Sequence, residues 1–306
     1  MKILTIRHGS LGDLIQALGP FQAIRRHHPD AHMIALTGPP YVELLQASGW
    51  FQEVWADDRP PVWNLSRWLA TVGRLRDARF ERVYDLQTST RTSAYFFLIG
   101  MPRWSGVAPF CSHPHENPNR VEMHTVDRQA EQLHMAGIPQ VPAPDLDWLD
   151  ADVSPFALPE RFAILVPGGS RHRPGKRWPY YAALAQELAG RGIAAAIMGT
   201  AAEADLASTI AAGVPSAIDL TGRTTVLELA GIARRALLAI GNDTGPMHAT
   251  AAVGCPSLVV FSNESDPARC APRGAKVATI RRPALADLPV AEVLQEASIL
   301  AGLRKT

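Results

Sequence analysis

Residues 241–248 have the sequence Gly-Asn-Asp-Thr-Gly-Pro-Met-His and directly follow the apolar stretch 236–240. Gly245 can take backbone angles closed to other residues, and Pro246 suits the first turn of a helix. The pattern predicts a strand that ends in a polar elbow and continues as a helix. Because the start of a helix presents unpaired N–H groups and the positive end of its dipole, this elbow could hold a phosphate group.

Three side chains bring further chemistry to the elbow: Asp243, Thr244 and His248. A carboxylate repels phosphate, so we expect Asp243 to cap N–H groups or to accept a hydrogen bond from a sugar hydroxyl. Thr244 lies with Gly245 beside the helix start, and His248 could contact phosphate or donate within the core. The alternative is an ordinary strand-to-helix turn in which Asp243 is only the N-cap.

A second loop of this kind follows the apolar stretch 162–166. It starts with a turn that lets the backbone approach a ligand closely, formed by Pro167, Gly168, Gly169 and Ser170. Residues 171–179 then hold four fixed cations and a histidine, a density that suits a doubly charged phosphate group. Lys176 is the best candidate for neutralising it, and Arg171 could add a forked contact. The alternative is a solvated basic loop.

Strand and helix patterns alternate along the chain, which predicts parallel sheets with helices on both faces. In the first half we expect strands near 2–7, 32–36, 52–55, 82–85 and 104–106, and helices near 12–27, 40–48, 64–77, 90–98 and 123–136. In the second half we expect strands near 162–166, 194–198, 216–219, 236–240 and 257–261, and helices near 179–190, 202–212, 225–234, 245–253 and 288–302. The proline-containing segment 139–159 is typical of a linker.

Length and composition agree with two globular α/β domains. The chain has 306 residues, of which 47% are hydrophobic and 19% charged. No apolar stretch approaches the roughly 18–20 residues of a membrane span, and Met1 leads into a strand rather than a signal peptide, so we expect a cytoplasmic protein. The three cysteines, an odd number without metal-type spacing, are expected to be reduced thiols.

Charge is distributed unevenly between the two halves. Lys+Arg and Asp+Glu number 14 and 17 in residues 1–155, and 16 and 12 in residues 156–306, giving −3 and +4. We therefore expect a polyanionic ligand to bind to the second half of the chain. The overall charge of +1 argues against a globally basic nucleic-acid binder.

In four segments, among them the two loops described above, the chain resembles glycosyltransferase family 9, the ADP-heptose:lipopolysaccharide heptosyltransferases. The resemblance spans nearly the whole chain and rests on four segments in the family's order: 1–13, 85–87, 167–179 and 242–248. One departure is residues 262–267, Ser-Asn-Glu-Ser-Asp-Pro, where the family often carries a Gly-Pro-Thr-type turn after a strand. This departure bears on the identity of the donor sugar more than on the reaction.

The resemblance implies a glycosyltransferase-B architecture, in which two Rossmann-like domains face a cleft. Residues 1–150 would bind the acceptor, and residues 151–306 would bind the nucleotide sugar. Transfer to a hydroxyl requires a base near the acceptor oxygen and positive charge for the departing diphosphate. Asp13, at the carboxyl edge of the first strand, is the candidate base, with the alternative that it caps a helix beginning at Leu14.

The resemblance implies further site residues. In the family an acid at the position of Glu203 contacts the nucleoside ribose, although Glu203 is also an unremarkable residue for the first turn of a helix. By analogy, the acceptor side would include Asp85, Gln87, Thr88 and Arg91.

The segment 59–82 contains six arginines and apolar residues at helical spacing: Trp63, Leu65, Trp68, Leu69, Val72 and Leu75. Such a segment suits an anionic membrane surface or a phosphorylated lipid. The favoured interpretation is that its apolar face packs on the sheet of the first domain.

The linker contains two Asp-x-Asp patterns, Asp145 with Asp147 and Asp150 with Asp152, which match a metal-binding pattern of another glycosyltransferase architecture. Two-acid spacings arise readily in an acidic linker, so we expect neither a metal nor any other cofactor.

The sequence therefore predicts a metal-independent, inverting glycosyltransferase. It would move a sugar, expected to be heptose from ADP-heptose, to a lipopolysaccharide-core or similar glycolipid acceptor at the inner face of the membrane. The rivals are a nucleotide-sugar epimerase on the same scaffold and a non-catalytic nucleotide-sugar-binding protein of envelope assembly. An NAD enzyme is disfavoured, because residues 7–13 lack the Gly-x-Gly-x-x-Gly spacing. We expect no nucleic-acid partner.

Overall fold

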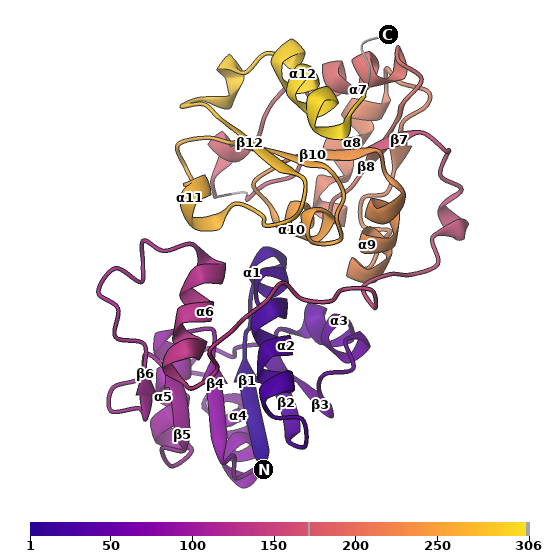
Figure 1. Ribbon diagram of the computed structural model, residues 1–306. Helices are drawn as coiled ribbons and strands as arrows, with labels where there is room; N and C mark the ends of the chain where they lie inside the picture. The colour runs from indigo at the N-terminus through magenta and orange to yellow at the C-terminus, as the bar shows by residue number, and fades with distance from the viewer. Residues whose placement is uncertain (171, 304–306) are drawn as a thin grey trace. The chain divides into compact units, whose positions relative to one another are not determined.

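The computed structural model describes residues 1–170 and 172–303 and consists of two compact units, Met1–Trp148 and Leu149–Thr306. The boundary lies two residues before the expected one, within the linker. Each unit is a parallel six-stranded sheet covered by helices (Figure 1). Among the described residues, none of the helices is both long and apolar enough to cross a membrane.

The first sheet is parallel and has the order β3-β2-β1-β4-β5-β6. Its strands are β1 Lys2–Ile6, β2 His32–Thr37, β3 Glu53–Ala56, β4 Arg82–Asp85, β5 Arg103–Gly106 and β6 His113–Pro114. The helices of this unit are α1 Leu11–Gln16, α2 Leu18–His27, α3 Val42–Ala47, α4 Leu65–Asp77, α5 Thr90–Leu98 and α6 Thr125–Met135. The central strands are apolar on both faces, as expected when helices cover both sides of a sheet.

One face of this sheet packs against α4 and α5. Val72 and Leu75 of α4 and Tyr95 and Phe96 of α5 share a core cluster with residues of the central strands. The expectation that the whole apolar side of 59–82 covers the sheet is therefore only partly correct, because Trp63, Leu65 and Leu69 are exposed.

The second sheet is parallel and has the order β12-β11-β10-β7-β8-β9. Its strands are β7 Phe162–Val166, β8 Ala194–Ile197, β9 Ile218–Asp219, β10 Leu238–Asn242, β11 Ser257–Phe261 and β12 Val277–Arg281. The helices are α7 Tyr181–Ala189, α8 Ala204–Ala211, α9 Val226–Arg235, α10 Gly245–Ala252, α11 Pro267–Cys270 and α12 Val290–Ala301. β7, β10 and β11 are buried along their whole length, and α7, α8 and α12 pack in one core cluster with them.

The structure corrects several expected elements. The helix expected over 12–27 is two helices, and the first begins at Leu11 after Ser10 as N-cap, so Asp13 is not a cap before Leu14. β6, β12 and α11 were not predicted. β6 and α11 are too short for a periodic signal, and β12 is an edge strand with only one buried residue.

Candidate active site

Both sheets have the same connectivity, because the first three strands run outward in one direction from the centre and the last three in the other. The order reverses between β1 and β4 in the first unit and between β7 and β10 in the second. Open α/β sheets bind ligands at this switch point, beyond the carboxyl ends of the strands. The four sequence segments from which chemistry was predicted include the carboxyl ends of these strands or the residues that directly follow them.

In the second unit the buried side chain of Asn242 joins the two loops. Its amide nitrogen donates to the carbonyl oxygens of Pro167 and Gly168, at 2.8 and 2.9 Å. The oxygen of the same side-chain amide accepts from the backbone N–H of Trp178 at 3.0 Å and from the hydroxyl of Tyr181 at 3.1 Å. Asn242 thus uses four hydrogen bonds to fix both ends of the basic loop against the end of β10.

The two loops also meet in an ion pair, since the Lys176 ammonium lies 2.6 Å from a carboxylate oxygen of Asp243. The two side chains are 12% and 8% exposed, so this pair is largely removed from water. Asp243 is therefore the partner of the predicted phosphate-binding lysine. The interpretation of Asp243 as the N-cap is wrong, because the N-cap of α10 is Thr244, without a side-chain capping bond.

α10 begins at Gly245, with Pro246 in its first turn, as the sequence predicts. Gly245 does not take a positive φ, so its expected special conformation is not used. The close approach is at Gly241, where a Cβ would lie 2.5 Å from the sulfur of Met247 and 2.7 Å from Cβ of Val166. Only glycine lets α10 pack so tightly on β7 and β10.

Four more predicted donor-site residues lie at this edge of the sheet. A Cβ at Gly168 would lie 3.1 Å from Cγ of Glu203, and one at Gly169 would lie 3.1 Å from Cγ of Arg177, so these glycines make room for two charged side chains. Ser170 is exposed and His248 is buried on α10. Arg171 lies outside the described residues.

The carboxylate of Glu203 caps its own turn, accepting from the Thr200 N–H at 2.9 Å and from the Thr200 hydroxyl at 2.5 Å. It thus closes a capping box at the end of β8 while its stem lies against Gly168. This placement serves local structure and also leaves Glu203 next to the loop after β7. A ribose contact by Glu203 stays a prediction.

In the first unit, Asp13 lies at the third position of α1, and its carboxylate accepts three hydrogen bonds. One carboxylate oxygen accepts from the guanidinium of Arg7 at 2.7 Å, and the other accepts from the N–H and the hydroxyl of Ser10, both at 3.2 Å. The Arg7 side chain is 5% exposed, whereas that of Asp13 is 44% exposed. A buried cation therefore fixes a carboxylate that solvent can reach.

The loop after β4 is built around Asp85, which is fully buried. Its carboxylate accepts from the N–H groups of Gln87 at 3.1 Å and Thr88 at 2.9 Å. Burial raises the pKa of Asp85 to about 6, against the lowering effect of these hydrogen bonds. Thr88 takes a left-handed φ of 48° and accepts from the guanidinium of Arg120 at 3.1 Å.

Gln87 joins this loop to the loop after β1. The oxygen of its side-chain amide accepts from the backbone N–H groups of His8 at 3.0 Å and Gly9 at 3.3 Å. Arg91 instead donates to the carbonyl of Pro60 and covers the ring of Trp68 at 4.8 Å. Asp13, Asp85, Gln87 and Thr88 thus belong to one loop cluster at the switch point, whereas Arg91 packs α5 against the segment before α4.

Sequence reasoning did not single out Arg7, Asn242 or the buried pair of His8 and Asp57. The His8 ring lies 3.0 Å from the Asp57 carboxylate, and both side chains are almost completely buried. Burial alone would raise the pKa of Asp57, but hydrogen bonds from His8 and Tyr95 hold it below its ordinary value. Their position in the sequence could have indicated them, because Arg7, His8 and Asn242 are polar residues at the ends of apolar strands.

The described residues contain no group of three or more His, Cys, Asp or Glu side chains that could hold a metal. The linker acids cap turns instead: Asp145, Asp150 and Asp152 accept from the N–H groups of Asp147, Ala151 and Ser154 at 2.8–3.1 Å.

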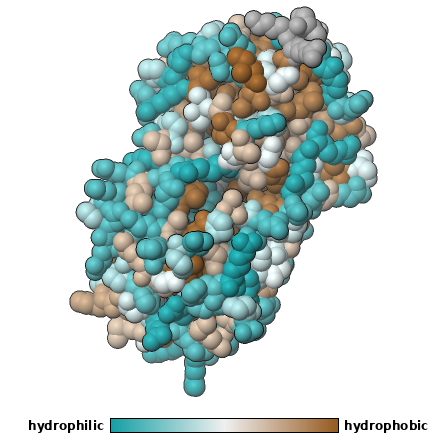
Figure 2. Space-filling view, in the orientation of Figure 1, coloured by the Kyte–Doolittle hydropathy of each residue, from teal (hydrophilic) through white to brown (hydrophobic). Residues whose placement is uncertain are grey.

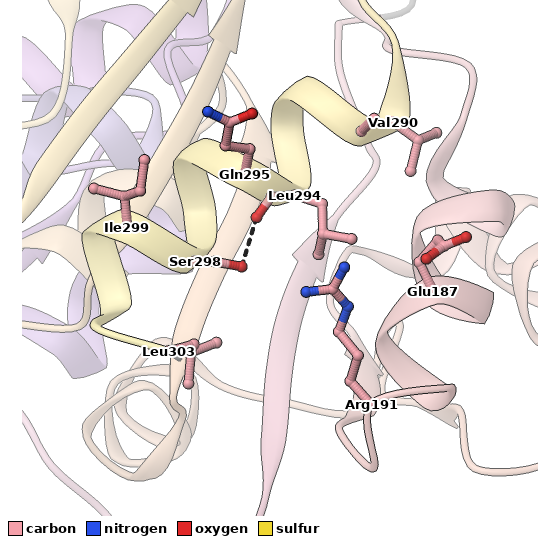
Figure 3. A pocket seen from close by; sticks show the side chains of 9 residues that line it. Glu187, Arg191, Val290, Leu294, Gln295, Ser298, Ile299 and Leu303 are labelled. Carbon is pink, nitrogen blue, oxygen red and sulfur yellow. Dashed lines mark hydrogen bonds between the residues drawn. The ribbon is translucent and has the colours of Figure 1, made fainter. Parts of the chain in front are cut away.

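A groove of about 700 Å³ lies between α12 and the end of α7, away from the strand ends. Leu294 and Arg191 project into it from opposite sides (Figure 3). Apolar side chains gather on this part of the surface, near the C-terminus (Figure 2). The polar residues of its lining, Glu187, Arg191, Gln295 and Ser298, come from helices and not from the loops at the switch point, so the groove is not the candidate site.

The family model for glycosyltransferase family 9 (heptosyltransferase) matches residues 68–292. Lipopolysaccharide heptosyltransferase 2 of Escherichia coli K12 is 26% identical over 318 aligned positions, covering 92% of this chain and 88% of that protein.

Two solved structures share the fold. The E. coli ADP-heptose lipopolysaccharide heptosyltransferase II has a TM-score of 0.79 at 20% identity, covering 98% of both chains. The E. coli heptosyltransferase WaaC with ADP has a TM-score of 0.75 at 20% identity, covering 98% of this chain and all of that one. Because the family model covers most of the residues and the two-sheet fold agrees, the chain belongs to glycosyltransferase family 9 and is a glycosyltransferase.

Proposed function

We propose that the protein transfers heptose, with inversion, from ADP-heptose to an acceptor of the lipopolysaccharide core. The observation that carries the proposal is the Lys176–Asp243 pair beside the start of α10, at the switch point of the second sheet. This arrangement provides a cation and helix N–H groups for a diphosphate. The names of the relatives and of the matched structures support the choice of donor and acceptor.

Lys176 is suited to the leaving group because an ammonium has three donors and Asp243 occupies one of them. The remaining donors can turn to the departing diphosphate while Asp243 keeps the side chain in place. The diphosphate acquires negative charge as the sugar bond breaks, so a preplaced cation lowers the barrier. Asp243 acts here as a positioning residue, and a second contact with a sugar hydroxyl belongs to the same proposal.

Asp13 is the proposed general base in the first unit. Arg7 and Ser10 together hold the two carboxylate oxygens, and the exposed part of the group can accept the proton of an acceptor hydroxyl. A single displacement with the base on the acceptor side inverts the sugar. Asp85, Gln87 and Thr88 would shape the acceptor side of the same loop cluster.

The reaction is proposed to need no metal, because Lys176 and the N-terminus of α10 can neutralise the diphosphate. Treatment with EDTA should leave turnover unchanged. Loss of activity that Mg²⁺ or Mn²⁺ restores would contradict this and return attention to the linker acids.

The test is incubation of the full chain with ADP-heptose and a lipopolysaccharide-core acceptor that lacks heptose, with Asp13→Asn as the matched control. Mass spectrometry should show one added heptose and release of ADP, both strongly reduced in the variant. Conversion of the donor without acceptor would favour the epimerase, and donor binding without turnover would favour a binding protein. We propose that the reaction takes place at the cytoplasmic face of the inner membrane, where such an acceptor is accessible.

A further inference from the structure

An exposed apolar patch lies at the start of α4 in the first unit. We call it the α4 patch and define it as Val62, Trp63, Leu65 and Leu69. Trp63 is 83% exposed, and Leu65 and Leu69 are 60% and 57% exposed. Single exposed apolar residues are common, but four within eight positions, one of them a tryptophan, mark a contact surface.

The residues of α4 that are buried in the core lie later in the helix than this patch. Val72 and Leu75 of α4 are buried, and Trp68 stacks on Tyr95 with ring centroids 5.2 Å apart. Leu65 lies two turns before the buried Val72 on the same side of the helix, so Leu65 and Leu69 are exposed because they belong to the start of α4, before the part that is buried in the core. The later part of α4 thus packs on the sheet in the same layer as α5 (Figure 1), and the start of the helix leaves apolar side chains exposed.

Arginines predominate among the charged residues of the segment that carries the patch. Between residues 59 and 79 the exposed charged side chains are one acid, Asp77, and five arginines: Arg59, Arg67, Arg74, Arg76 and Arg79. Arg76 follows Leu69 by seven residues and so lies on the same helix face. Arg67 also pairs with Asp58, just before this segment. The surface therefore combines apolar side chains with a net positive charge.

We propose that the α4 patch docks the protein on the surface of an anionic lipid bilayer. Tryptophan suits the bilayer interface because its ring is apolar and its N–H is polar, and leucines gain by leaving water. Arginine stems can follow the apolar side chains while the guanidinium groups meet lipid phosphates. A second copy of the chain fits less well, since a twofold contact would place this positive surface against itself.

This proposal rests on the proposed function, because the α4 patch would bring the first unit to an acceptor that is held in the membrane. Binding to vesicles is measured without donor or acceptor. The two proposals can therefore fail separately.

The test is flotation of the full chain with phosphatidylcholine vesicles that contain or lack phosphatidylglycerol. The protein should float with the anionic vesicles, and less so as salt rises. The triple variant Trp63→Ser, Leu65→Ser, Leu69→Ser should reduce the partition coefficient by roughly tenfold or more. Arg76→Glu should reduce it by roughly fivefold. Ile299→Ser, at an exposed residue of α12 in the other unit, is the matched control and should bind like the wild type.

Thermal unfolding should be unchanged in these variants because the substituted side chains are exposed. Equal flotation of the triple variant and the wild type would overturn the proposal, as would equal binding to neutral vesicles. A wild-type dimer that the triple variant dissociates, without vesicle binding, would assign the patch to a second copy instead. Transfer to a detergent-dispersed acceptor should survive the triple substitution, and its absence in the wild type would count against the proposed function alone.

Discussion

Gln87 in the first unit and Asn242 in the second both join two loops across a switch point, but Gln87 does so through its side-chain oxygen, whereas Asn242 uses both ends of its amide group. Gln87 accepts from the N–H groups of His8 and Gly9. Asn242 donates to the carbonyls of Pro167 and Gly168 and accepts from the backbone N–H of Trp178. The two sheets share one strand order, so the difference lies in the loops.

As a consequence, the switch points of the two sheets, which are equivalent in topology, offer different chemical groups to a ligand. In the first unit, N–H groups of the loop after β1 are taken up by Gln87, and Asp13 presents a carboxylate that suits an acceptor hydroxyl. In the second unit, Asn242 takes up two carbonyl oxygens and one N–H of the loop after β7, and this loop also supplies Lys176 beside the start of α10. The second unit is therefore better suited to bind a phosphate group.

The largest expected effect tests the role of the first unit. Asp13→Asn should lower turnover by roughly 10²–10⁴ while donor affinity stays nearly unchanged, because a general base acts in the chemical step. Single-turnover rates and calorimetric titration with the donor separate the two quantities. Wild-type turnover combined with weakened donor binding would refute the assignment of Asp13 as the base.

The next effect compares the two amides. Asn242→Ala leaves several buried partners without hydrogen bonds and should lower the free energy of unfolding by about 3–5 kcal/mol. Gln87→Ala, at a less buried residue, should lower it by about 1 kcal/mol. Urea denaturation measures both, and similar losses would mean that the two switch points are not built differently.

Much of this fold could be predicted from the sequence, because the central strands are continuous apolar runs and most helices carry strong periodicity. The Lys176–Asp243 pair could not, since the two residues are 67 positions apart and only the packing of β7 against β10 brings their loops together. The same holds for the pairing of Arg7 with Asp13, where the local pattern predicted a helix cap. Sequence placed these charges at the correct edge of each sheet without identifying their partners.

A smaller effect concerns Asp85 and pH. Burial raises the pKa of Asp85 to about 6 in the folded protein, above the ordinary value of 3.8. The native state thus holds this proton more tightly, so its contribution to stability falls as pH rises from about 4 to 6. The loss amounts to about 3 kcal/mol above that window. Asp85→Asn should remove this dependence in urea unfolding measured across the range.

His28 provides an opposing slope that must be separated from this effect. Burial lowers the pKa of His28 from 6.5 to about 4, so its contribution to stability is lost as pH falls from 6.5 toward 4. His28→Gln should therefore steepen the fall of stability with rising pH that Asp85 causes. An unchanged pH profile in Asp85→Asn would show that this carboxyl does not titrate as its burial implies.

The smallest expected effect on activity or ligand binding tests the second unit through Lys176 and Asp243 together. Lys176→Met should weaken binding of ADP by roughly 1.5–3 kcal/mol, the range of a charged hydrogen bond, and wild-type affinity should fall as salt rises. It should also lower stability, because Asp243 then stays buried without its cation. Asp243→Asn removes a negative charge, so it should keep ADP affinity while turnover and affinity for the full donor fall.

The double variant decides between a direct and an indirect role of Lys176. Lys176→Met with Asp243→Asn should recover most of the stability, since no unpaired charge remains buried. If Lys176 contacts the diphosphate, ADP affinity should stay as low as in Lys176→Met. Recovery of ADP affinity together with stability would mean that the pair only holds the two loops in place, and the phosphate would then depend on α10 and the remaining cations of the basic loop.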